Sequence, residues 1–231
     1  MKIGIIGAIK EEIKRFKRII CLNQKHVQNY IIYIGKFKKH NIYLIQSGIG
    51  KVAASIATMI LINLYQLDII INSGSAGSLE SSLKIGEIIL PKTVCYYDVD
   101  LTNFNYAYGQ IPTYPKQFKI NKKLNKFFQE KNLRKKLIFK TGLIITGDSF
   151  IQNNTCINIL KSKFPSAIAV DMESAAIAQV CYKFNIPLII VKSISDLSNE
   201  DATDNFKKNI SIASLNSYIF VKYILENIII T

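Results

Sequence analysis

Short apolar runs alternate with amphipathic segments along most of the chain. The first run, Lys2–Gly7, predicts a buried strand, and the charged stretch Glu11–Ile20 after it predicts a helix. Further strands are predicted at Tyr30–Ile34, Ile42–Gln46, Asp68–Asn72, Glu87–Leu90, Thr93–Tyr97, Lys140–Ile145, Ala167–Val170 and Pro187–Lys192. Further helices are predicted at Lys51–Tyr65, Asn121–Lys131, Glu173–Phe184 and from about Asn205 to Ile228.

This order of elements predicts an α/β sandwich with a largely parallel sheet, because strands alternate with helices. Glycine and small polar residues predict turns or loops at Ser47–Gly50, Lys36–Asn41 and Ser73–Ser78, and Asp98–Pro115 is expected to be an irregular, aromatic-rich loop. The sequence contains no internal repeat, linker or low-complexity segment, so we expect one domain over residues 1–231.

The net charge of +14 allows two interpretations. A basic surface can neutralise nucleic-acid phosphates. Alternatively, AT-rich codons produce this mixture of Ile, Lys, Asn, Tyr and Phe without selection for charge. The lysines are scattered, with only small clusters such as Lys135-Lys136 and Lys207-Lys208. We therefore favour compositional drift and expect no nucleic-acid partner.

No apolar run reaches the ~18 residues of a membrane span, and Glu11 and Glu12 soon follow the first run. We expect no membrane or targeting segment and a cytoplasmic protein. The four cysteines form no CxxC pair, so neither a zinc site nor a redox motif is predicted.

Carboxylates follow several predicted strands, although the chain has only 16 of them. Examples are Glu12, Asp148, Asp171 and Asp196. Ligands of open α/β sheets bind outside the carboxyl ends of the strands, so these acids favour a site at that edge. Taken singly, each could instead be an acid in the first turn of a helix.

The glycine segments are weaker signals. Ser47–Gly50 and Ser73–Ser78 could bind phosphate through backbone N–H groups, but they match neither a P-loop nor a complete GxGxxG motif. His26 and His40 are the only histidines and are expected in polar connections. A Ser-His-Asp triad or a histidine metal site is therefore not expected, and the chemistry is assigned to carboxylates.

Seven segments in order along the chain resemble one family, the 5′-methylthioadenosine/S-adenosylhomocysteine nucleosidases. The segments are Met1–Glu12, Ser47–Ala54, Ile71–Gly77, Tyr106–Pro112, Thr146–Ile151, Val170–Ala176 and Ser193–Asp196. The resemblance implies a nucleoside phosphorylase-like three-layer α/β/α sandwich with a mixed, largely parallel sheet, assembled as a homodimer. It also implies hydrolysis of the N-glycosidic bond of methylthioadenosine, S-adenosylhomocysteine and 5′-deoxyadenosine in methionine salvage, without metal or cofactor.

The resemblance further implies residue roles. Asp196 would be the general acid that protonates adenine, and Glu12 would be the base that activates water. Glu173 would hold the ribose hydroxyls, Met172 would pack against the ribose, and Ser75 would lie near the water. Protonation of a poor leaving group and a carboxylate beside a developing cation are what such a reaction requires.

The remaining implied contacts concern the two ends of the substrate. Backbone groups at Phe150 and Ile151 would contact the adenine edge, and Ile49 and Phe206 would line the pocket for the 5′-alkylthio group. Two residues, Phe104 and Pro112, would reach that pocket from the second subunit.

Three positions depart from the family pattern. Lys192 stands where arginine is usual near the attacking water, Asp171 stands where glutamate is usual, and Ser78 replaces a common glycine. Lysine keeps the charge but lacks the planar fork of arginine, so positioning of the water could weaken.

Two alternative functions remain. In a phosphorylase of the same fold, the carboxylate of Glu12 would repel phosphate, and the chain offers no convincing arginine cluster. An RNA-binding protein would need exposed aromatic residues beside the lysines, and only Asp98–Pro115 could supply them.

Overall fold

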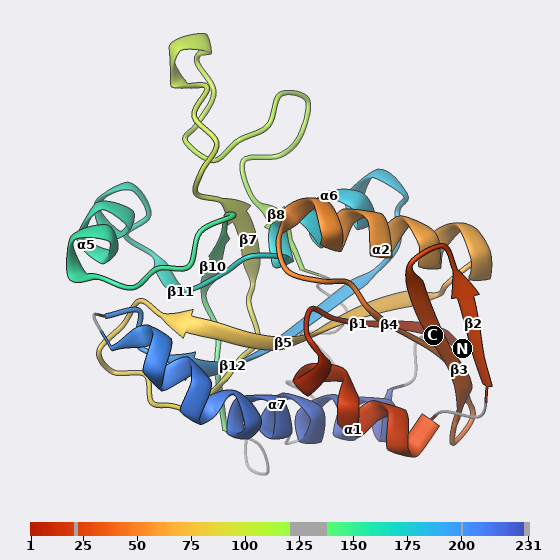
Figure 1. Cartoon of the computed structure of the whole chain (residues 1–231). Helices are drawn as coiled ribbons and strands as arrows, with labels where there is room; N and C mark the ends of the chain where they lie inside the picture. Colours follow the sequence, from red (N-terminus) through yellow and green to blue (C-terminus); the bar gives the residue numbers. More distant parts are fainter. Residues whose placement is uncertain (21–22, 121–137, 200, 229–231) are drawn as a thin grey trace.

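The computed structural model describes residues 1–20, 23–120, 138–199 and 201–228. A central sheet lies between two layers of helices (Figure 1). α2 (Lys51–Tyr65) and α6 (Ser174–Lys183) cover one face. α1 (Lys10–Ile20) and α7 (Ala202–Asn227) cover the other. The three-layer α/β/α arrangement is thereby confirmed.

The sheet has twelve strands in the described part of the chain. They are β1 (Lys2–Gly7), β2 (Asn23–Val27), β3 (Tyr30–Phe37), β4 (His40–Gln46), β5 (Ile69–Ser78), β6 (Ile88–Ile89), β7 (Thr93–Tyr96), β8 (Phe118–Lys119), β9 (Phe139–Lys140), β10 (Leu143–Thr146), β11 (Ala167–Asp171) and β12 (Leu188–Asp196). The order is β2-β3-β4-β1-β5-β11-β10-β7-β8, and β12 pairs with β5 and β6 outside this path. The central pairs β1–β4, β1–β5, β5–β12 and β10–β11 are parallel, whereas β2–β3, β3–β4 and β5–β11 are antiparallel.

Both faces of the central strands are buried. Ile5 and Ile71 pack with Phe16 in the cluster on the α1 and α7 side. Ile6 and Ile70, their neighbours in sequence, belong to the cluster on the α2 and α6 side. Because successive strand side chains point to opposite faces, a strand covered on both sides needs a continuous apolar run.

Two central strands are longer than predicted. β5 continues through Ser73–Ser78, which the sequence predicted as a loop, and β12 continues to Asp196. The two strands pair in parallel from Leu188 with Ile70 to Asp196 with Gly77. The prediction was wrong because small polar residues can stay in a strand when neighbours on both sides satisfy their backbone groups.

The structure also has elements that the sequence did not predict. β2 contains His26 and pairs antiparallel with β3, so this histidine is not in a connection. His40 begins β4 and is buried. α5 (Asn154–Lys163) begins after Asn153, whose side chain accepts a hydrogen bond from the backbone N–H of Cys156 at 2.7 Å.

The helix predicted at Asn121–Lys131 lies outside the described residues. Within the described ranges, no helix is long and apolar enough to cross a membrane. The same ranges contain no group of three or more His, Cys, Asp or Glu side chains arranged to hold a metal ion. The described Cys95, Cys156 and Cys181 are free thiols.

Candidate active site

A cavity of about 460 Å³ lies where β1, β5, β11 and β12 end. Its size is within the ~300–1,000 Å³ that is usual for small-molecule sites. Its lining combines several carboxylates with an apolar wall. The lining residues are Ala8, Ile9, Glu12, Ile49, Ser75, Ala76, Gly77, Ser149, Phe150, Ile151, Val170, Asp171, Met172, Glu173, Ser195, Asp196, Ser198, Thr203, Phe206 and Lys207.

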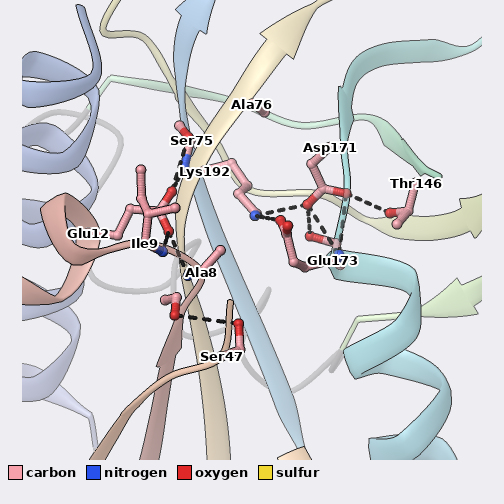
Figure 2. A network of polar contacts seen from close by, with 12 residues as sticks. Ala8, Ile9, Glu12, Ser47, Ser75, Ala76, Thr146, Asp171, Glu173 and Lys192 are labelled. Carbon is pink, nitrogen blue, oxygen red and sulfur yellow. Dashed lines mark hydrogen bonds and ion pairs between the residues drawn. The ribbon is translucent and has the colours of Figure 1, made fainter. Parts of the chain in front are cut away.

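Glu12 is held by donors from two elements. Its Oε2 accepts hydrogen bonds from the backbone N–H groups of Ala8 at 2.7 Å and Ile9 at 3.3 Å. Its Oε1 accepts the backbone N–H of Ser75 at 2.9 Å and the Ser75 hydroxyl at 3.0 Å (Figure 2). Glu12 lies in the first turn of α1 and is only 4% exposed. Four donors therefore fix this carboxylate at one wall of the cavity.

The approach of β5 to Glu12 requires glycine at position 74. A Cβ atom on Gly74 would lie 2.6 Å from Oε1 of Glu12 and 2.9 Å from its Cδ. These separations are shorter than van der Waals contact, so a side chain at Gly74 would displace the carboxylate.

Glu173 lies opposite, at the N-terminal end of α6. Its Oε1 accepts the backbone N–H of Gly50 at 3.0 Å, and its Oε2 lies 3.6 Å from Nζ of Lys192. Burial raises the pKa of Glu173 to about 7, while the Lys192 ammonium opposes the shift and the carboxylates of Asp171 and Glu12 add to it. Glu173 therefore changes charge near neutral pH.

Lys192 is buried behind Glu173. Its Nζ lies 2.9 Å from Oδ2 of Asp171, and Figure 2 shows the side chain directed toward this pair of acids. Asp171 in turn accepts the Thr146 hydroxyl at 2.6 Å and is bonded by the hydroxyl of Ser174. Burial lowers the pKa of Lys192, but the surrounding carboxylates more than offset this effect and raise it. Lys192 thus remains a buried cation shared between two acids.

Asp196 ends β12 and is almost fully buried. It accepts the Ser195 hydroxyl at 2.8 Å and the backbone N–H of Ser198 at 3.0 Å. Burial raises the pKa of Asp196 above its ordinary range, although the bonds from Ser195 and Ser198 act in the opposite direction. A Cβ on Gly77 of β5 would lie 2.9 Å from Oδ1 of Asp196, so this carboxyl also faces β5 closely.

The apolar wall comes from four separate segments. Phe150 and Phe206 meet edge to face with ring centroids 5.8 Å apart. Ile49, Ile151 and Met172 also line the cavity. A cluster of acids beside an edge-to-face pair of aromatic rings can hold a planar, uncharged ring next to a group that develops charge.

Phe104 and Pro112, which were expected to reach the pocket of the second subunit, lie away from this chain's own cavity. Phe104 ends the short 3₁₀ turn η1 (Thr102–Phe104) and is 71% exposed. Phe104 and Pro112 are outside the set of described residues that line the cavity, and their loop projects beyond the α2 and α6 layer (Figure 1). Lys192 also lies outside that set and contacts the acids from behind.

Other residues belong to the site but were not singled out in the sequence. Ile9 and Ser198 line the cavity. The backbone N–H of Ile9 donates to Glu12, and that of Ser198 donates to Asp196. Thr203 and Lys207 line it together with Phe206. Their spacing along α7 places all three on one helical face, which is a signal that the sequence contained.

Comparisons with known proteins agree with this geometry. The family model of the phosphorylase superfamily matches residues 2–226. A 5′-methylthioadenosine/S-adenosylhomocysteine nucleosidase of Buchnera aphidicola is 64% identical over 230 residues, which cover 99% of each chain. The chain belongs to this nucleosidase family. A family member from Staphylococcus aureus is 43% identical over 216 residues, 93% of this chain and 95% of that protein.

A solved structure supports the same assignment. The nucleosidase of Neisseria meningitidis in complex with methylthio-immucillin-A has a TM-score of 0.94 and 31% identity to this chain, covering 98% of it and 99% of that chain. The resemblance inferred from the seven segments is confirmed. Two of the departures from the nucleosidase pattern, Lys192 and Asp171, are partners in one buried ion pair.

Proposed function

We propose that this chain hydrolyses the N-glycosidic bond of 5′-methylthioadenosine and S-adenosylhomocysteine, releasing adenine and the 5′-substituted ribose. The observation that carries the proposal is one cavity lined by a buried Asp196, a Glu12 whose orientation is fixed by hydrogen bonds from Ala8 and Ser75, and Glu173. The family membership and the nucleoside analogue bound to the Neisseria relative support the same reaction.

Departure of the base is assigned to Asp196. Adenine leaves poorly as an anion, so a proton delivered to its five-membered ring lowers the barrier. Burial raises the pKa of Asp196, which favours the protonated form that a general acid requires. Backbone groups at Phe150 and Ile151 would contact the adenine edge, beside the Phe150–Phe206 ring pair.

Attack by water is assigned to Glu12. A carboxylate whose orientation is fixed by four donors is already positioned to accept the proton of an attacking water. The Ser75 hydroxyl lies beside it and would help to hold that water. The sugar cation that develops between base and water would be stabilised by ionised Glu173, which would also bind the ribose hydroxyls, with Met172 packed against the ring.

The 5′ end of the cavity supports the proposal of a homodimer. Ile49 lines the cavity yet is 59% exposed, and Val52 and Ile56 continue an exposed apolar stripe along α2. A second copy that covered this stripe could bring its Phe104 and Pro112 over the 5′-alkylthio group. Exposed apolar stripes of this kind are typical of interface cores.

Phosphorolysis is the competing reaction. A phosphate nucleophile needs several cations, whereas the described lining contains one, Lys207, and Lys192 is engaged by acids behind the wall. Glu12 would repel phosphate. We further propose that the enzyme acts in the cytoplasm without metal or cofactor.

The test is to incubate purified protein with 5′-methylthioadenosine, with and without phosphate, and to identify the sugar by mass spectrometry. We expect free methylthioribose at a rate that phosphate does not increase. Methylthioribose 1-phosphate as the product would overturn the assignment, and no adenine release with or without phosphate would overturn the proposed function altogether.

A further inference from the structure

We infer that Lys207 recognises a carboxylate at the end of the substrate's 5′ substituent and thereby favours S-adenosylhomocysteine over methylthioadenosine. The inference rests on the proposed function and concerns the substrate preference of the same site. Lys207 lines the cavity from α7 but is exposed. No ion pair joins Lys207 to another residue that the structure describes, which leaves its ammonium available to a ligand at the mouth.

The position of Lys207 along α7 indicates the end of the cavity at which it lies. Thr203 donates a hydrogen bond to Gln152 at 3.1 Å and thus adjoins the segment of Phe150 and Ile151, where the adenine is assigned. Lys207 is four residues further along the helix, about 6 Å. It follows Phe206, which is assigned to the 5′-alkylthio pocket, and Ser211, one turn further along α7, borders a cavity lined by residues of α1. Ile9, just before α1, lines the same cavity.

Basic side chains predominate on the α1 side of Lys207, although Asp204 lies three residues before it on α7. Ser211, one further turn along α7, borders a second cavity of about 230 Å³. The other lining residues of that cavity are Lys10, Lys14, Arg15, Arg18 and the single acid Glu11. The cations of this second cavity add positive charge on that side of Lys207, which can attract an anionic group on a substrate.

The two proposed substrates differ at this end. The 5′ substituent of methylthioadenosine is a neutral methylthio group, whereas that of S-adenosylhomocysteine ends in a carboxylate and an ammonium group. A lysine ammonium on a flexible stem can meet a carboxylate without fixed geometry. Because Lys207 is exposed, we expect a modest and salt-dependent increase in kcat/KM for the substrate that carries a carboxylate.

The experiment compares Lys207→Met with the matched control Lys208→Met, since Lys208 is exposed on α7 but outside the described cavity lining. The substrates are methylthioadenosine, S-adenosylhomocysteine, and a thioadenosine whose 5′ sulfur carries either a butanoate or its amide. In Lys207→Met, kcat/KM for butanoate relative to amide should fall about two- to fivefold, as for loss of an exposed ion pair. The ratio for S-adenosylhomocysteine over methylthioadenosine should fall in parallel, and Lys208→Met should retain both ratios.

Ionic strength provides a second readout. The screening length falls from about 30 Å at 0.01 M salt to about 3 Å at 1 M. The butanoate preference of the unaltered enzyme should therefore decline with salt, and that of Lys207→Met should change less. Equal ratios in Lys207→Met and the unaltered enzyme would overturn the inference while methylthioadenosine hydrolysis still upheld the proposed function. If the unaltered enzyme hydrolyses none of the four substrates, the proposed function fails instead.

Discussion

Replacing Lys192 by methionine would remove the buried cation without changing the size of the side chain greatly. Asp171 and Glu173 would then share a buried space without their counter-charge. Since burial already raises the pKa of Glu173 to about 7, loss of the ammonium should raise it further. Glu173 would then be protonated over more of the neutral range, and protonated Glu173 cannot stabilise a sugar cation as a carboxylate does.

The size of the effect follows from the distance. Nζ of Lys192 lies 3.6 Å from Oε2 of Glu173, and two unit charges at that distance interact by about 4.6 kcal/mol at an effective dielectric constant of ~20. That energy corresponds to about three powers of ten in the protonation equilibrium of Glu173. The closer pairing of Lys192 with Asp171, at 2.9 Å, makes this an upper limit. We therefore expect the pH below which activity falls, the acid limb of the pH–activity profile, to rise by about one pH unit or more.

The assay is the pH dependence of kcat/KM for methylthioadenosine. In the unaltered enzyme, activity should fall as the pH falls through about 7, because Glu173 then takes up a proton. In Lys192→Met this limb should lie at higher pH and the maximum should be lower. Lys192→Arg keeps the charge, so its limb should stay in place. An unchanged limb in Lys192→Met would refute the reasoning.

Folding must be controlled in that experiment, because breaking a buried ion pair costs about 3–5 kcal/mol. The double variant Lys192→Met with Asp171→Asn removes both charges of the closer pair. It should recover thermal stability relative to the single variant while its acid limb still differs from that of the unaltered enzyme.

Three further predictions follow from the site. Gly74→Ala should lower kcat by about 10²-fold and also lower the thermal unfolding temperature, because the added Cβ displaces the buried Glu12 from its hydrogen bonds, and near-normal turnover would contradict that contact. Asp196→Asn should lower turnover of methylthioadenosine by at least ~10²-fold but affect a nitrophenyl riboside far less, and an equal loss on both substrates would exclude the general-acid role. Light scattering should give about twice the 26.1 kDa chain mass, and Phe104→Ala should raise KM for methylthioadenosine; a fully active monomer would rule out a shared site.

The alternation of strands and helices was predictable because each central strand is an apolar run bounded by small residues. The boundaries were not. Ser73–Ser78 was predicted as a loop from its composition, whereas its pairing with β12, more than a hundred residues away, keeps it in the sheet. β2 was missed because it is an edge strand with mostly exposed polar side chains, which lacks the apolar alternation of a half-buried strand.

Within the candidate site, the sequence could identify the carboxylates but not their partners. Two of the donors to Glu12 are the backbone N–H groups of Ala8 and Ile9, and backbone groups leave no mark in residue type. The sequence could not show that Nζ of Lys192 lies against Asp171 and Glu173. That outcome depends on the register of β12 against its neighbours, which is set by long-range pairing.

β5 contacts both ends of the proposed reaction centre. Ser75 binds Glu12, and Gly77, two residues later, lies against Asp196. Two residues of a strand advance about 6.6 Å, so the backbone of β5 sets the separation of the two carboxyl groups. Substitutions at the surface leave this spacing intact, and lysines can accumulate there. An insertion or deletion of a single residue between Ser75 and Gly77 would change the spacing and reverse the side-chain alternation beyond it. The site therefore fixes the number of residues between Ser75 and Gly77, as well as the glycines at positions 74 and 77.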